Sequence, residues 1–103
     1  MGLVGIKHLH TGILPDQFQL FQNYPNPFNP KTTIQYELPV AAKIELTVFD
    51  ILGKHVKTLM NSWQAAGIYL VEFDGRDLSS GVYLYRLKID QQRVLTKKMI
   101  LLK

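Results

Sequence analysis

Three histidines are the side chains with the most obvious capacity for chemistry. His8 and His10 form a His-x-His pair, and His55 stands alone. Zinc is held by imidazole, thiolate or carboxylate groups, but the chain has no cysteine and no carboxylate cluster lies near these histidines in the sequence. A zinc site would need ligands assembled from distant segments, so the sequence favours exposed histidines that bind no metal.

Acidic and hydroxyl side chains form no catalytic pattern either. Half of the eight acids lie in or beside expected turns: Asp50, Glu72, Asp74 and Asp77. The segment 74–77 lacks the spaced oxygen ligands and terminal glutamate of a calcium loop, so turn capping is the better interpretation. Ser79 and Ser80 lack the Gly-x-Ser-x-Gly context of a hydrolase nucleophile. We therefore predict a non-catalytic domain without a cofactor.

Aromatic residues suggest two further kinds of binding site. The candidates are Trp63, Tyr69, Phe73, Tyr83 and Tyr85. If exposed and coplanar, they would form a sugar-stacking platform, but aromatic residues on alternating strands more often pack in the core. Aromatic and basic residues also interleave over 83–86, yet no recognised RNA- or DNA-binding motif is present. The sequence predicts no nucleic-acid partner.

The elements that must position these residues are β-strands. Apolar and polar residues alternate, and β-branched and aromatic residues are frequent, in six segments spaced about ten residues apart. These segments are 32–38, 43–50, 54–60, 68–74, 82–90 and 93–102. The connections are too short for the crossovers that parallel pairing requires. The expected fold is an all-β, immunoglobulin-like antiparallel sandwich of about seven strands.

Turn residues separate these strands. In the first hairpin, the Asp50 carboxylate is expected to cap the turn and Gly53 to adopt a left-handed conformation. Asp74 and Gly75 mark a second reversal, and Gly81 begins the next strand, where a positive φ is also expected. We expect Asp50, Gly53, Asp74 and Gly75 to shape the fold.

A proline-rich segment precedes the first predicted strand. Prolines fix φ and remove amide donors, so the segment is expected to be extended and to lie outside the middle of a sheet. Pro25, Asn26 and Pro27 are assigned an architectural role, fixing how the chain enters the sandwich. Tyr24 and Phe28 are expected to anchor the segment against it.

Length and composition limit the chain to one small domain. It has 103 residues, of which 47% are hydrophobic, and this suits a folded globular domain. We assign the domain to residues 18–103 and interpret residues 1–17 as a linker or tail. No apolar run is long enough to cross a bilayer, and the first residues lack the apolar core and cleavage site of a signal peptide.

Positive charge is concentrated near the C-terminus. Residues 1–85 contain six Lys or Arg and seven Asp or Glu, whereas residues 86–103 contain six basic residues and one acid, Asp90. Such a segment can attract an anionic surface or an acidic partner. Lysines on an edge strand also discourage aggregation between sheet edges, so both interpretations remain open.

Four ordered motifs resemble a known family over about 85 of the 103 residues. The motifs are YPNPFNPKTTI at 24–34, VFDILGK at 48–54, FDGRDLSSGVY at 73–83 and KKMILLK at 97–103. They are similar to those of the type A C-terminal sorting domain of the type IX (Por) secretion system. That family shares an immunoglobulin-like fold with the C-terminal part of flagellar hook-capping proteins. Phe73 stands where the family more often has tryptophan.

The resemblance implies a non-catalytic export signal on a larger secreted or cell-surface protein of Bacteroidetes-like bacteria. Such a parent reaches the periplasm first; an outer-membrane translocon then recognises the folded domain, and a cell-surface signal peptidase typically removes it. The expected recognition residues are Gly81, Tyr83, Lys97, Lys98 and Lys103. The domain is expected to be a monomer without membrane insertion. The alternatives are an immunoglobulin-like spacer and a carbohydrate-binding accessory module of a secreted enzyme.

Overall fold

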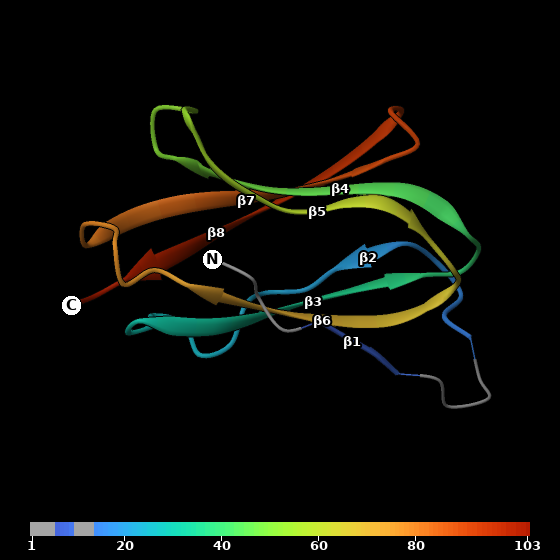
Figure 1. Cartoon of the computed structure of the whole chain (residues 1–103), viewed down its shortest axis with the longest axis horizontal. Helices are drawn as coiled ribbons and strands as arrows, with labels where there is room; N and C mark the ends of the chain where they lie inside the picture. The colour runs from blue at the N-terminus through green and yellow to red at the C-terminus, as the bar shows by residue number, and fades with distance from the viewer. Residues whose placement is uncertain (1–5, 10–13) are drawn as a thin grey trace.

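Eight β-strands dominate the computed structural model, which describes residues 6–9 and 14–103 (Figure 1). The strands are β1 (Ile6–Leu9), β2 (Gln19–Leu20), β3 (Lys31–Leu38), β4 (Ala42–Asp50), β5 (His55–Gln64), β6 (Gly67–Asp74), β7 (Gly81–Ile89) and β8 (Arg93–Leu101). Within these described ranges, no helix is long and apolar enough to span a membrane.

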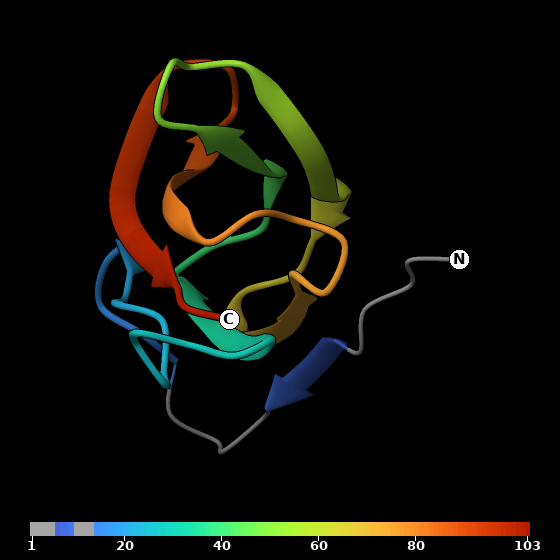
Figure 2. The ribbon, with the colours of Figure 1, turned by 90° about the vertical axis from the view of Figure 1, so that its left-hand side faces the viewer.

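The strands form two four-stranded antiparallel sheets that face each other. One sheet has the order β1-β6-β3-β2 and the other the order β5-β4-β7-β8. Figure 2 shows the two layers from one end, with β2 and β8 at the edges on one side and β1 and β5 on the other. The prediction of an all-β antiparallel sandwich is confirmed.

Alternation places one face of each long strand in the core. In β3, Ile34, Tyr36 and Leu38 are fully buried and the residues between them are partly exposed, as the period of two requires. The Tyr36 ring stacks on Tyr69 of β6, with centroids 5.2 Å apart. Most of the aromatic candidates are core residues, as predicted: Tyr69, Phe73, Tyr83 and Tyr85 are buried. Trp63 differs, because it lies on edge strand β5 and is 69% exposed.

Two short strands are missing from the sequence prediction. β1 lies within the segment interpreted as a linker or tail and pairs with β6, from Ile6 opposite Val71 to Leu9 opposite Ile68. β2 contributes only two residues, which pair with β3. Such short edge strands form only because they pair with the backbone of a longer neighbouring strand. They are too short to show an alternation that would identify them in a sequence. The domain boundary at residue 18 stays a prediction.

Candidate functional site

The four motif segments meet at one end of the sandwich. In Figure 1 the proline-rich segment, the β4–β5 hairpin, the loop before β7 and the C-terminus all lie at the left-hand end. The pairing agrees, because Gly81 lies opposite Leu101 and Tyr83 lies opposite Asp50. We call this surface the motif end and define it as residues 24–30, 50–54, 74–81 and 101–103.

The β4–β5 hairpin presents two apolar side chains on a fixed turn. One carboxylate oxygen of Asp50 accepts hydrogen bonds from the backbone N–H groups of Leu52 and Lys54, both at 2.9 Å. Gly53 has a φ of +85° and donates its N–H to the Asp50 carbonyl. The predicted cap and left-handed glycine are therefore confirmed. The turn leaves Ile51 60% exposed and Leu52 89% exposed. Neither residue is a candidate from the sequence alone, because the turn residues Asp50 and Gly53 place them at a hairpin tip but do not determine how far that tip lies from the core.

The proline-rich segment joins the end of β8. Phe28 donates its N–H to the Ile100 carbonyl at 2.9 Å and accepts the Leu102 N–H at 3.0 Å. The side-chain oxygen of Asn26 accepts the Ile100 N–H at 2.9 Å. The Phe28 ring is buried, so its predicted anchoring role is confirmed. The segment thus takes the place of a strand beside the last residues of β8.

Tyr24 does not anchor the segment, and that prediction is wrong, because its side chain is 80% exposed. Its backbone N–H and C=O exchange hydrogen bonds with Thr33 of β3. Residues directly opposite each other in an antiparallel pair point to the same face of the sheet. Thr33 faces away from the core, whereas its neighbour Thr32 is buried. The Tyr24 ring is therefore directed outward.

A buried polar junction holds the start of this segment. The Asn23 N–H donates to the Tyr85 hydroxyl, and that hydroxyl donates to the Phe21 carbonyl, both at 2.7 Å. The Asn23 amide also donates to the Pro25 carbonyl at 3.1 Å. Burial raises the pKa of Tyr85 to about 12. The peptide bond between Asn26 and Pro27 is cis. The hydrogen bonds of Asn23, Pro25 and Asn26 support an architectural role for this stretch.

The loop before β7 packs closely against the C-terminal strand. Gly75 donates its N–H to the Pro30 carbonyl at 2.8 Å. A Cβ added at Gly75 would lie 3.2 Å from Leu101 Cδ2 and 3.3 Å from Phe28 Cε2. A larger residue here would therefore press on both side chains, which would have to shift by a few tenths of an ångström. At Gly81 the predicted positive φ is confirmed: φ is +157°, a backbone conformation that residues with a side chain rarely adopt, although a Cβ there would meet open space.

Asp74, at the start of this loop, forms an ion pair with a neighbouring arginine. Its carboxylate accepts the Arg76 N–H at 2.9 Å and pairs with the Arg76 guanidinium at 2.7 Å. The side-chain hydrogen bond from Arg76 is the main cause that lowers the pKa of Asp74. Among the described residues, no group of three or more His, Cys, Asp or Glu side chains could hold a metal ion. Of the sequence candidates, His10 lies outside those residues.

The structure divides the five expected recognition residues into two groups. Gly81, Tyr83 and Lys103 belong to or adjoin the motif end, where Lys103 donates its N–H to Ser80 Oγ at 2.9 Å and its ammonium group to the Arg76 carbonyl. Tyr83 is only 8% exposed and donates its hydroxyl to the Ser79 carbonyl at 2.7 Å.

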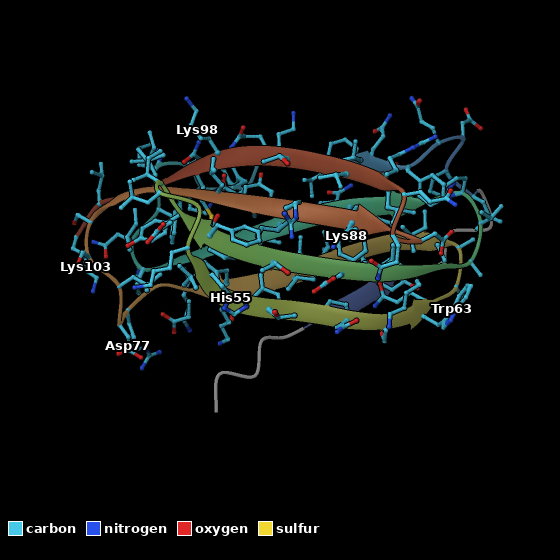
Figure 3. The ribbon with its side chains drawn as sticks, turned by 90° about the horizontal axis from the view of Figure 1, so that it is seen from above. His55, Trp63, Asp77, Lys88, Lys98 and Lys103 are labelled. Carbon is cyan, nitrogen blue, oxygen red and sulfur yellow. The ribbon has the colours of Figure 1, made fainter. Side chains whose placement is uncertain are left out.

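Lys97 and Lys98 form the second group, on β8. Figure 3 shows Lys98 projecting from the edge of the sandwich and Lys103 lying at its end. At about 3.3 Å per residue of strand, Lys97 is roughly 20 Å from Lys103 along the chain. A partner must therefore contact two separate places to reach all of these lysines.

The family described as a secretion system C-terminal sorting domain matches residues 22–102. No curated protein and no solved structure matches the chain. Domains of this family are C-terminal secretion signals for the type IX secretion system and are non-catalytic in general. They act with the secretion machinery on a parent cargo protein, which is exported across the outer membrane to the cell surface or outside. Because the match covers most of its length, this chain belongs to the family of secretion system C-terminal sorting domains.

Proposed function

We propose that the outer-membrane translocon recognises this export signal through the motif end. The observation that carries the proposal is the pair of exposed apolar side chains, Ile51 and Leu52, on a turn fixed by Asp50 and Gly53. Apolar side chains that enter a pocket of the partner dominate the energetics of many interfaces. A turn that is already ordered adds little entropic cost when such side chains are buried.

The expected recognition residues take different parts in this proposal. Gly81 and Lys103 lie on the same end as the hairpin tip. Tyr83 acts from the core as a positioning residue, because its hydroxyl holds the Ser79 carbonyl in the loop before β7. Lys97 and Lys98 supply a second, electrostatic contact on β8, where both side chains are exposed.

The finer features of the family complete the proposal. The cargo protein precedes the domain, and a cell-surface signal peptidase cleaves the connection between them. The domain itself catalyses no reaction, binds no nucleic acid and acts as a monomer. Lysines on the edge strand β8 support the last point, because charged edges discourage pairing between copies.

A carbohydrate-binding role has weaker support. Its platform would need exposed aromatic rings that lie together. Trp63 and Tyr24 are exposed, but Trp63 lies opposite Lys43 at the start of β4, toward the end of the sandwich away from Asp77 and Lys103 (Figure 3). Tyr24 belongs to the motif end, so the two rings form no common platform.

Export of a reporter tests the proposal. The full chain is fused behind a signal peptide and a reporter, in a host with type IX secretion, and the reporter is measured in periplasm and medium. Leu52→Ser should lower export at least about tenfold while the melting temperature stays unchanged, because an exposed side chain contributes little to stability. Trp63→Ser is the matched control, since it removes an exposed apolar residue from the other end, and should export like the unaltered chain.

Lysine variants separate the two contact surfaces. Lys→Gln at both 97 and 98 removes the charges on β8, whereas Lys103→Gln removes the charge at the motif end. Each variant should reduce export without changing melting, because exposed charges add little stability. Normal export of the Leu52→Ser fusion would refute recognition through the hairpin tip. A stable fusion that stays in the periplasm, beside a known sorting domain that is exported, would favour the spacer alternative.

A further inference from the structure

The outer edge of β8 is covered over one half and open over the other. At its C-terminal end, Ile100 bonds to Asn26 and Phe28, and the Lys98 carbonyl accepts the Gln22 side-chain amide at 2.6 Å. Alternate residues of an antiparallel edge strand direct their N–H and C=O groups outward. Val94 and Thr96 continue this series.

No neighbour occupies the outward backbone groups of Val94 and Thr96, as far as residues 6–9 and 14–103 are concerned. Both residues are exposed, and β8 is the last strand of its sheet. Unpaired N–H and C=O groups in a row are a template for another strand. The N-terminal half of β8 therefore offers a short free edge.

A groove lies beside this free edge, between the two sheets. It has a volume of about 480 Å³ and is lined by residues 18–22 and 95–97. The two-residue strand β2 is too short to cover it. Arg93, Leu95 and Lys97 share the face of β8 that borders the groove, and the Arg93 guanidinium lies 5.5 Å from the centre of the Phe18 ring. This face therefore carries a basic, an apolar and a basic side chain in turn.

Charge decides which strand this edge accepts. A second copy of the chain would place Arg93, Lys97 and Lys98 against the same residues, and like charges on facing strands are destabilising. The one acid in the last 18 residues is Asp90, and its carboxylate already accepts the Lys43 N–H at 2.9 Å. A strand that pairs with this edge must therefore carry negative charge, which β8 of a second copy does not supply.

We infer that the free edge of β8 binds an extended acidic segment of a partner protein, which adds to the sheet as a fifth strand. Arg93, Leu95 and Lys97 select acidic, apolar and acidic side chains at alternate positions of that segment. Hydrogen bonds to the backbone of Val94 and Thr96 hold it in register. In this inference Lys97 acts by pairing with an acidic side chain of the added strand. The inference rests on the proposed function only in taking the partner from the secretion machinery.

Peptide binding to the purified chain tests this inference apart from export. The probe is a capped peptide of sequence Thr-Glu-Thr-Val-Thr-Glu-Thr, and the control peptide has lysine in place of both glutamates. In a titration followed by NMR, the acidic probe should shift the Val94 and Thr96 amide signals and slow their hydrogen exchange. High salt should weaken binding, because the exposed charges are then screened. The lysine peptide should not bind.

Two variants locate the site. Thr96→Pro removes an outward N–H without removing a bond to β7 and should weaken binding at least about tenfold. Asn61→Pro, at an exposed position of the opposite edge strand β5, is the matched control and should bind like the unaltered chain. Lys97→Glu should reduce binding of the acidic probe and allow the lysine peptide to bind, which tests the site even if a proline variant does not fold.

Four results would overturn the inference: no binding of the acidic probe, equal binding of both peptides, signal shifts confined to residues outside β8 and its groove, or unchanged selectivity in Lys97→Glu. If Leu52→Ser loses export and the unaltered chain binds no peptide, recognition through the motif end stands and the added strand is refuted. If the unaltered chain binds the acidic peptide and Leu52→Ser is exported normally, the added strand stands and recognition through the hairpin tip is refuted.

Discussion

Replacing Tyr85 by phenylalanine tests the buried junction between β7 and the segment that leads into the proline-rich region. The Tyr85 hydroxyl accepts the Asn23 N–H and donates to the Phe21 carbonyl, both at 2.7 Å. The variant keeps the ring but leaves two backbone groups without their partner, and Asn23 is buried. Each buried unsatisfied group costs about 1–3 kcal/mol. Because Phe21 is only partly buried, its carbonyl can recover some hydration, so we expect the free energy of unfolding to fall by about 2–4 kcal/mol.

Urea unfolding and thermal melting measure this loss. For a domain of about 100 residues, 1 kcal/mol lowers the melting temperature by about 4 °C, so a fall of roughly 10 °C is expected. Tyr24→Phe is the matched control, because the Tyr24 side chain is 80% exposed, and should change stability by less than about 0.5 kcal/mol. If Tyr85→Phe were as stable as Tyr24→Phe, the junction would contribute nothing and the reasoning would be refuted.

The same variant has a signature in alkaline solution. Burial raises the pKa of Tyr85 to about 12 from the usual 10, so the folded state holds this proton more tightly than the unfolded chain. The resulting stability is fully present below pH 10 and is lost as pH rises through 12, by up to about 3 kcal/mol. Tyr36, whose pKa burial also raises, is present in both proteins. Between pH 9 and 12, the free energy of unfolding should therefore fall less steeply with pH for Tyr85→Phe than for the unaltered chain.

Three further substitutions test the motif end by thermal melting or hydrogen exchange. Gly53→Val should cost about 1 kcal/mol or more, because φ is +85° there; an unchanged melting temperature would contradict this. Gly75→Ala should cost about 1–3 kcal/mol through contact with Leu101 and Phe28, and unchanged melting would show that these side chains move aside freely. Phe28→Ala should cost about 3–5 kcal/mol and speed exchange of the Leu102 amide, which Phe28 accepts; a protected amide would show that the backbone pairing survives without the ring.

The local features of this protein follow from its sequence. Six long strands are predicted within a few residues of their ends, because alternation records which face each strand buries. The capped turn at Asp50 and Gly53 is predicted as well, since both residues act through their own or adjacent backbone groups. The ordered motifs also indicate the family, which the match over residues 22–102 confirms.

The state of the sheet edges is decided only by tertiary structure. Asn26 and Phe28 cover the end of β8 through contacts that span more than 70 residues of sequence, and no local pattern specifies which distant backbone will meet them. The same long-range pairing turns Tyr24 outward, leaves the Val94 and Thr96 edge open, and separates Lys97 from Lys103. Exposure of Ile51 and Leu52 likewise depends on where the hairpin ends relative to the core. Sequence periodicity determines the faces of the strands, whereas the edges and ends, where a partner binds, depend on how the two sheets come together.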